Sequence, residues 1–175
     1  MVRLRSPLTL SKVEVSNKIA VIGIGNTLRR DDGIGIIILD SLLKFHKREE
    51  VDYLNFGIAS FDILHRIQDY DAVLLIDGMN ASVRTGELKI FTLEDIKYTM
   101  GTLNTSTHEL SLKNIFDLCK NFGLKTKIYV AGIQVGDTSY GESISEPLKK
   151  QLDKIVREVC CFIDKNLCVM RYQAG

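Results

Sequence analysis

Residues 18–45 read KIAVIGIGNTLRRDDGIGIIILDSLLKF, and this stretch decides the fold class. Its first six residues, Lys18–Gly23, form a short apolar run that is typical of a buried strand. A glycine-rich turn follows, and the next segment, Gly33–Phe45, is expected to be a helix. The apolar residues of this segment recur at helical spacing, at Ile34, Ile38, Leu42 and Phe45. A strand that enters a helix through such a turn starts the strand–helix alternation of α/β folds.

Strand and helix patterns alternate along the rest of the chain. Further strands are expected at Val51–Phe56, Ala72–Ile76, Gly86–Leu93 and Lys127–Ile133. Helices are expected after a cap at Ser60, from Thr107 to Phe122, and from Ser145–Pro147 onward. The wholly apolar strand Ala72–Ile76 is expected at the centre of the sheet, whereas the alternating pattern of Gly86–Leu93 predicts a more exposed strand. The sequence therefore predicts a three-layer α/β/α sandwich whose twisted sheet is mostly parallel, with one antiparallel edge strand.

The composition is that of a globular protein. Of the 175 residues, 45% are hydrophobic and 26% are charged, which excludes a disordered or fibrous chain. The sequence has no repeat, low-complexity tract or linker that would divide it, so we expect a single domain over residues 1–175. Residues 1–17 form an N-terminal lead before the first strand and are expected to be poorly ordered.

The charge balance and the cysteine pattern argue against several classes of partner and site. The chain has 23 Lys and Arg against 22 Asp and Glu, so its net charge of +1 gives no electrostatic reason to expect nucleic acid or an anionic membrane as a partner. The sequence has no apolar run long enough for a signal peptide or a bilayer span, and we expect a cytoplasmic protein. The cysteines have neither zinc-site nor disulfide spacing, so we expect buried, reduced thiols at Cys119, Cys160, Cys161 and Cys168.

Polar residues follow the first predicted strand at its carboxyl end, where α/β folds place their binding crevice. Asp31 and Asp32 end the glycine-rich turn. The turn lacks the third glycine of a dinucleotide fingerprint because Leu28 stands there, and two carboxylates would repel a pyrophosphate. Capping of the following helix is an ordinary use of aspartate, so we expect one of the two acids to cap it and the other to be available for other work.

Two more candidates follow later in the chain. Asp77 ends a fully apolar strand, where an acid must face the crevice, find a partner, or serve as the turn residue before Gly78. His108 opens a helix, and taken alone it favours a structural or solvated role. Together, Asp32, Asp77 and His108 are expected on one solvent-facing edge, where two carboxylates and one imidazole suit a divalent ion such as nickel or zinc. Three ligands without a thiolate leave positions open for water or substrate.

These segments resemble the [NiFe]-hydrogenase maturation endopeptidases, over Lys18 to Leu167. The opening pattern of that family, Gly-Asn followed by two acids and Gly-x-Gly, stands here as Gly25-Asn26 and Asp31-Asp32-Gly33-Ile34-Gly35. The family's aspartate after a hydrophobic strand matches Asp77, and its histidine after a Thr/Ser-rich stretch matches His108.

The resemblance has further matches and two departures. The family's Gly-Ile-Gln element is matched at residues 132–134. A second glycine and a hydroxyl residue, common after the second strand in the family, are missing next to Gly57, and the usual proline is replaced by Val135. These departures concern the fit of the substrate more than the metal site.

The resemblance implies a specific activity and a specific set of residues. The chain would remove the C-terminal extension of a [NiFe]-hydrogenase large-subunit precursor once nickel is installed. Ni²⁺ would arrive with the precursor and be bound by Asp32, Asp77 and His108, and Zn²⁺ or Cd²⁺ could take its place in vitro. Substrate-binding or supporting roles are implied for Gly25, Asn26, Asp31 and Gly57, with Asp31 as a cap or as a support for the metal ligands.

The sequence leaves the mechanism and two other functions open. Nickel could polarise the scissile carbonyl or activate a water. It could instead serve recognition only, while Asp32 and Asp77 act as an acid–base pair. The alternative functions are a nucleotide- or small-ligand-binding α/β module without protease activity, and a hydrolase of another small substrate that uses the same metal site.

Overall fold

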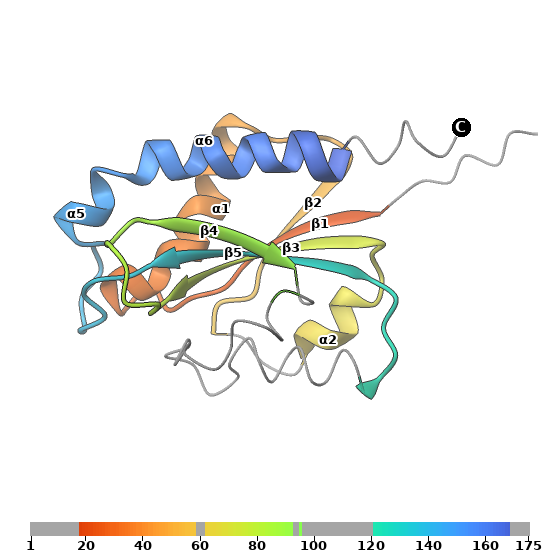
Figure 1. Ribbon diagram of the computed structural model, residues 1–175, viewed down its shortest axis with the longest axis horizontal. Helices are drawn as coiled ribbons and strands as arrows, with labels where there is room; N and C mark the ends of the chain where they lie inside the picture. Colours follow the sequence, from red (N-terminus) through yellow and green to blue (C-terminus); the bar gives the residue numbers. More distant parts are fainter. Residues whose placement is uncertain (1–17, 59–61, 93–94, 96–120, 169–175) are drawn as a thin grey trace, which may run out of the picture.

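The computed structural model describes residues 18–58, 62–92, 95 and 121–168, which contain one five-stranded sheet (Figure 1). Its strands are β1 (Ile19–Gly23), β2 (Val51–Asn55), β3 (Ala72–Met79), β4 (Leu88–Thr92) and β5 (Lys127–Gln134). They lie in the order β2-β1-β3-β5-β4, and all neighbours are parallel except β4, which pairs antiparallel with β5 at the edge. The predicted central strand, the mostly parallel sheet and the antiparallel edge strand are confirmed.

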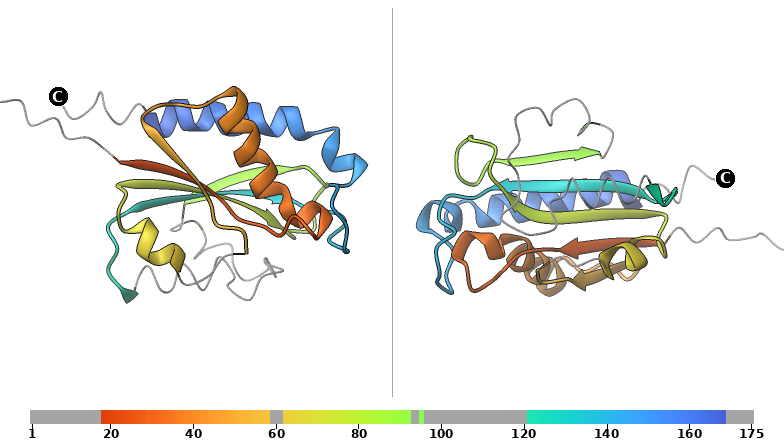
Figure 2. Two further views of the ribbon diagram at one scale, coloured as in Figure 1. Left: turned by 180° about the vertical axis from the view of Figure 1, so that it is seen from behind. Right: turned by 90° about the horizontal axis from the view of Figure 1, so that it is seen from below.

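Helices cover both faces of this sheet and complete the three predicted layers (Figures 1 and 2). One face is covered by α1 (Ile34–Phe45), α5 (Glu146–Lys149), α6 (Leu152–Phe162) and the π-helical turn η2 (Ile163–Leu167). The other face is covered by α2 (Asp62–Ile67). The cap predicted at Ser60 and the N-terminal lead 1–17 lie outside the described residues, as does nearly all of the helix predicted from Thr107 to Phe122.

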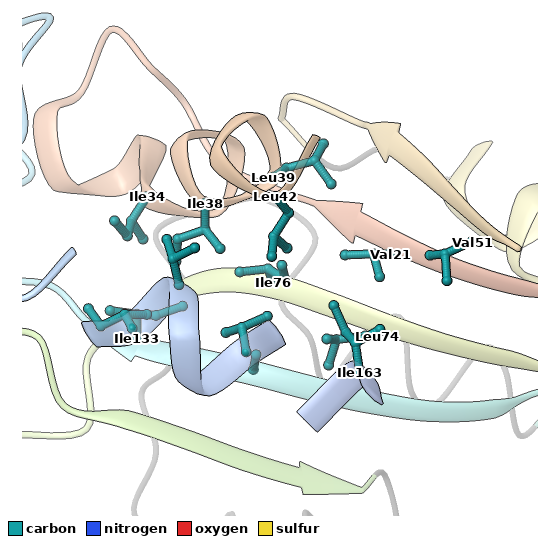
Figure 3. Packing of buried hydrophobic residues seen from close by; sticks show 14 of the residues in the cluster. Val21, Ile34, Ile38, Leu39, Leu42, Val51, Leu74, Ile76, Ile133 and Ile163 are labelled. Atoms are coloured by element: carbon teal, nitrogen blue, oxygen red, sulfur yellow. The ribbon is translucent and has the colours of Figure 1, made fainter. Parts of the chain in front are cut away.

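Strand β3 shows how the core is divided between the two faces. Leu74 and Ile76 pack on the side of α1 and α6, whereas Val73 and Leu75 pack on the side of α2, and all four are fully buried. Figure 3 shows Ile38 of α1 pointing toward the strand. Complete burial of a Leu or Ile side chain contributes about 1.5–3 kcal/mol. Burial on both faces therefore holds β3 at the centre of the sheet.

Strand β3 also runs three residues past its predicted end at Ile76. The neighbouring β5 continues alongside, so that Asp77 is opposite Gly132 and Met79 is opposite Gln134. Acidic residues and glycine are uncommon inside strands, which is why the pattern predicted an earlier end. Asp77 is thus held inside a ladder, and its interpretation as a turn residue is wrong.

Phe45, the last residue of α1, is 68% exposed, because it extends past the edge of the core. The expectation that the cysteines are buried is wrong. Cys161 is exposed, and Cys160 and Cys168 are half-buried, since aliphatic residues occupy the inward face of α6. The thiols of Cys160 and Cys161 form no disulfide, as expected, and Cys119 lies outside the described residues.

The C-terminal helix begins where the sequence predicts but is interrupted. Ser145 precedes α5 with extended backbone and Pro147 lies in the first turn, yet α5 ends at Lys149 and α6 starts only at Leu152. The hydroxyl of Ser145 does not cap the helix. Over the described residues, none of the helices combines the length and the apolar character that crossing a bilayer requires.

Candidate functional site

The glycine-rich turn brings α1 against the carboxyl ends of the strands. A Cβ atom at Gly35 would overlap the carbonyl oxygens of Ile24 and Ile76, so only glycine permits this approach. Gly25 has a φ of +149°, and a Cβ there would overlap the backbone of the following turn. These close approaches let the short 3-10 helix η1 (Arg30–Gly33) pack against β3 and bury its two acids.

Asp31 is fully buried and holds the segment that follows β5. Its Oδ2 accepts hydrogen bonds from the backbone N–H groups of Gly136 and Asp137, both at 2.9 Å. Ser145 donates its backbone N–H to Oδ1 at 2.6 Å and its hydroxyl to Oδ2 at 2.8 Å. The carboxylate of Asp31 is thus bonded to the segment after β5 and not to the first turn of α1, whose N-cap position is Gly33, so the predicted capping role is wrong for Asp31. Asp31 instead joins two loops that lie far apart in the sequence.

Asp32 and Asp77 form a buried acid pair. Each side chain is only 2% exposed, so the expectation of a solvent-facing edge is wrong for these two residues. Burial raises the pKa of Asp77 well above its usual range, and the charge of Asp32 raises it further, against a hydrogen bond from the Gly78 N–H that lowers it. The structure therefore brings these two predicted residues close enough for one to affect the ionisation of the other.

This arrangement of acids fits a bound cation. Two neighbouring carboxyl groups in a low-dielectric site cannot both ionise at low cost, whereas a divalent ion would neutralise both charges. The N-terminus of α1 begins two positions after Asp32, and its partial positive charge works against a cation. The paired carboxylates have to outweigh that effect.

The third predicted ligand, His108, lies outside the described residues. Within the part of the chain that the structure describes, no group of three or more His, Cys, Asp or Glu side chains is placed to hold a metal ion. The described residues include two of the three predicted metal ligands, Asp32 and Asp77, and the complete three-ligand site stays a prediction.

Gly25, Asn26 and Gly57 shape the backbone beside the acid pair. The N–H of Gly25 donates to the carbonyl of Gly57 at 2.8 Å, which joins the loops after β1 and β2. The side-chain oxygen of Asn26 accepts the N–H of Leu28 at 3.0 Å, and Gly57 has a φ of +51° that favours glycine. Contacts of these residues with a substrate stay a prediction.

Gln134 is a buried polar residue to which the sequence analysis gave no role. Its Oε1 accepts the N–H groups of Ala81 at 2.7 Å and Val83 at 3.4 Å, and its Nε2 donates to a backbone carbonyl at 2.7 Å. These bonds shape the loop that follows β3, two residues past Asp77. A polar residue at the end of an apolar strand was the available signal, and it is the same signal that identified Asp77.

Comparison with known proteins assigns the chain to a family. The family model HycI, described as hydrogenase maturation protease, matches residues 37–161, which is more than half of the chain. The chain belongs to the hydrogenase maturation protease family. The resemblance seen in the sequence motifs is thereby confirmed, and membership of a protease family makes the protein a hydrolase.

Two named relatives match over most of their length. The hydrogenase expression/formation protein HoxM of Azotobacter vinelandii is 24% identical over 160 residues, which cover 90% of this chain and 77% of HoxM. A hydrogenase maturation protease homologue of Methanocaldococcus jannaschii is 29% identical over 170 residues, which cover 90% of this chain and 95% of that protein.

Solved structures of maturation proteases share the fold. The [NiFe] hydrogenase maturation protease HycI from Thermococcus kodakarensis KOD1 superposes with a TM-score of 0.67 at 25% identity, over 85% of this chain and 94% of that one. The hydrogenase maturating endopeptidase HybD from E. coli superposes with a TM-score of 0.74 at 20% identity, over 86% of this chain and 94% of that one.

Proposed function

We propose that this protein removes the C-terminal extension of a [NiFe]-hydrogenase large-subunit precursor after nickel has been inserted. The observation that supports this most is the buried acid pair Asp32 and Asp77, at the carboxyl ends of the strands in a maturation-protease fold. The same pair argues against the alternative of a nucleotide-binding module, because it would repel phosphate groups.

In this proposal nickel belongs to the precursor and is part of the substrate. Asp32, Asp77 and His108 bind it, and Zn²⁺ or Cd²⁺ can replace it in vitro. A precursor without nickel lacks the ion that these three residues bind, and therefore loses this contact with the site. Recognition through the metal thus makes the cleavage follow nickel insertion.

The acid pair can also take part in the hydrolysis. The oxygen of a water molecule bonds to the scissile carbonyl carbon, the C–N bond breaks, and a proton from the water ends on the leaving amine. One carboxylate of the pair can accept the proton from water, and the other, as an acid, can donate one to the amine. Nickel, when bound, would supply Lewis-acid polarisation of the carbonyl.

An assay with purified precursor tests this function. Nickel-loaded and nickel-free precursor are each mixed with the protein, and cleavage is followed by mass spectrometry. We expect cleavage of the loaded form only, and a loss of at least about 100-fold in rate for Asp32→Asn, Asp77→Asn and His108→Ala. His65→Ala, an exposed histidine on α2, is the matched control and should cleave normally.

Three results would count against the proposal. Equal cleavage of both precursor forms would show that nickel is not required. If neither form is cleaved, the proposed protease activity is wrong. If any two of the three site variants keep full activity, the assignment of these residues to the site is wrong. Circular dichroism of each variant shows whether a loss of activity reflects the site or the fold.

A further inference from the structure

Exposed apolar side chains lie at the same edge of the sheet as the acid pair. Among the described residues, three large apolar side chains follow the carboxyl ends of parallel strands and remain exposed: Leu28 after β1, Ile58 after β2 and Tyr140 after β5. Leu28 is 61% exposed and Tyr140 is 83% exposed. Large apolar groups that gather in water beside a candidate site indicate a surface that a partner covers.

The loops that bear Leu28 and Tyr140 are fastened to each other. The N–H of Gly141 donates to the carbonyl of Leu28, and the N–H of Arg30 donates to the carbonyl of Gly141, both at 2.9 Å. The Nε of Arg29 donates to the carbonyl of Thr138 at 3.1 Å. The four hydrogen bonds to the buried carboxylate of η1 described above join the same two loops. The two exposed side chains therefore stand on a rigid support.

An arginine and an aromatic ring, one from each of these two loops, are in contact. The guanidinium of Arg29 lies over the ring of Tyr140, 5.7 Å from its centroid, in cation–π geometry. Tyrosine and arginine are the residue types that dominate the binding energy of protein–protein interfaces. A pair that is already held in place loses little conformational entropy when a partner binds. These features fit a protein partner better than a small molecule.

The two joined loops lie within one turn of the acid pair, because the N–H of Asp32 donates to the carbonyl of Arg29 at 3.0 Å. We propose that Leu28, Arg29 and Tyr140 form a docking platform for an apolar patch on the folded body of the protein substrate. This inference rests on the proposed function, since the body of a large subunit whose cleavage site reaches Asp32 would lie beside these residues. Three side chains cover far less than the roughly 1,200–2,000 Å² of a stable interface, which fits a transient substrate and not a permanent dimer.

Kinetics on nickel-loaded precursor test the platform. We expect Tyr140→Ala and Leu28→Asp to raise KM by about tenfold or more each while kcat stays near the wild-type value, because docking is lost and the acids are untouched. Tyr140→Phe keeps the ring and should keep the wild-type KM. Phe45→Ala is the matched control: Phe45 is also exposed and has Lys44 over its ring at 5.0 Å, but it lies at the far end of α1.

The outcomes separate the platform from the proposed function. An unchanged KM in both platform variants, a fall in kcat alone, or an equal rise in KM for Phe45→Ala would overturn the platform. If the wild type does not cleave the precursor, the proposed function fails, and binding to immobilised precursor then decides the platform. Binding by the wild type that Tyr140→Ala abolishes supports it, and an absence of wild-type binding overturns it. Sedimentation tests whether the wild type self-associates. If it does and Tyr140→Ala abolishes the association, the surface binds a second copy of the chain, and the proposed substrate platform is overturned.

Discussion

Removal of the Asp31 carboxylate should destabilise the fold strongly, although Asp31 is not a predicted metal ligand. Asp31→Ala leaves three backbone N–H groups and one hydroxyl, all in partly buried hydrogen bonds, without their acceptor. An unsatisfied donor costs about 1–3 kcal/mol when it is fully buried, and because these four are partly buried and such costs are not additive, we expect a total of roughly 3–5 kcal/mol. Asp31→Asn keeps one acceptor oxygen but turns an NH₂ group toward a donor, which should cost roughly 2–3 kcal/mol. Ser145→Ala removes one hydroxyl donor only and should cost about 1 kcal/mol.

Urea unfolding measures the free energy of unfolding of the three variants, and the loss should be largest for Asp31→Ala and smallest for Ser145→Ala. In thermal unfolding, a loss of roughly 3–5 kcal/mol in a domain of this size lowers Tm by about 6–20 °C. Asp137→Ala is the matched control, because Asp137 is a neighbouring acid of the same loop whose contact with Arg30 is exposed, and its stability should change little. An Asp31→Ala protein within about 1 kcal/mol of the wild type would refute the claim that these hydrogen bonds hold the two loops together.

Two further predictions concern the acid pair and the turn beside it. Because the pKa of Asp77 is raised in the folded protein, the stability that its protonation provides is present below the usual carboxyl pKa near 3.8 and is lost as the pH rises through the raised value. Asp77→Asn should therefore exceed the wild type in stability at neutral pH, because it removes the cost of ionising this buried acid. Urea unfolding should show the difference shrinking as the pH falls, and a constant difference would contradict the raised pKa. Gly35→Ala should destabilise by about 2 kcal/mol or more, because its Cβ meets two carbonyl oxygens of the backbone. Asp40→Ala, on the exposed face of the same helix, should change stability by less than about 0.5 kcal/mol, and equal effects of the two changes would contradict the close approach.

The fold was predictable because its signals are local. The apolar run of β1, the helical spacing in α1 and the wholly apolar start of β3 each identify an element from adjacent residues. The extension of β3 through Asp77 was not predictable, because it depends on pairing with β5. Long-range pairing of this kind leaves no trace in a single segment.

The candidate site was predictable in part for the same reason. Asp32 ends a glycine-rich turn and Asp77 ends a wholly apolar run, which made both acids stand out in the sequence, and the sheet topology brings them together. The role of Asp31 was missed because its partners, which include Ser145, come from a loop more than a hundred positions away. The burial of the pair was also missed, since the charge of an acid predicts exposure and its neighbours in space are not visible in the sequence.

The most direct test of the account is the position of a bound metal ion. A crystal of the protein with Ni²⁺ or Cd²⁺, measured near the absorption edge of the metal, should show one anomalous peak between the three predicted ligands. We expect the ion at about 2.0–2.2 Å from a carboxylate oxygen of Asp32, a carboxylate oxygen of Asp77 and an imidazole nitrogen of His108, as for zinc in proteins. A bound ion at this edge that His108 does not reach, or an ion bound only elsewhere, would contradict the account.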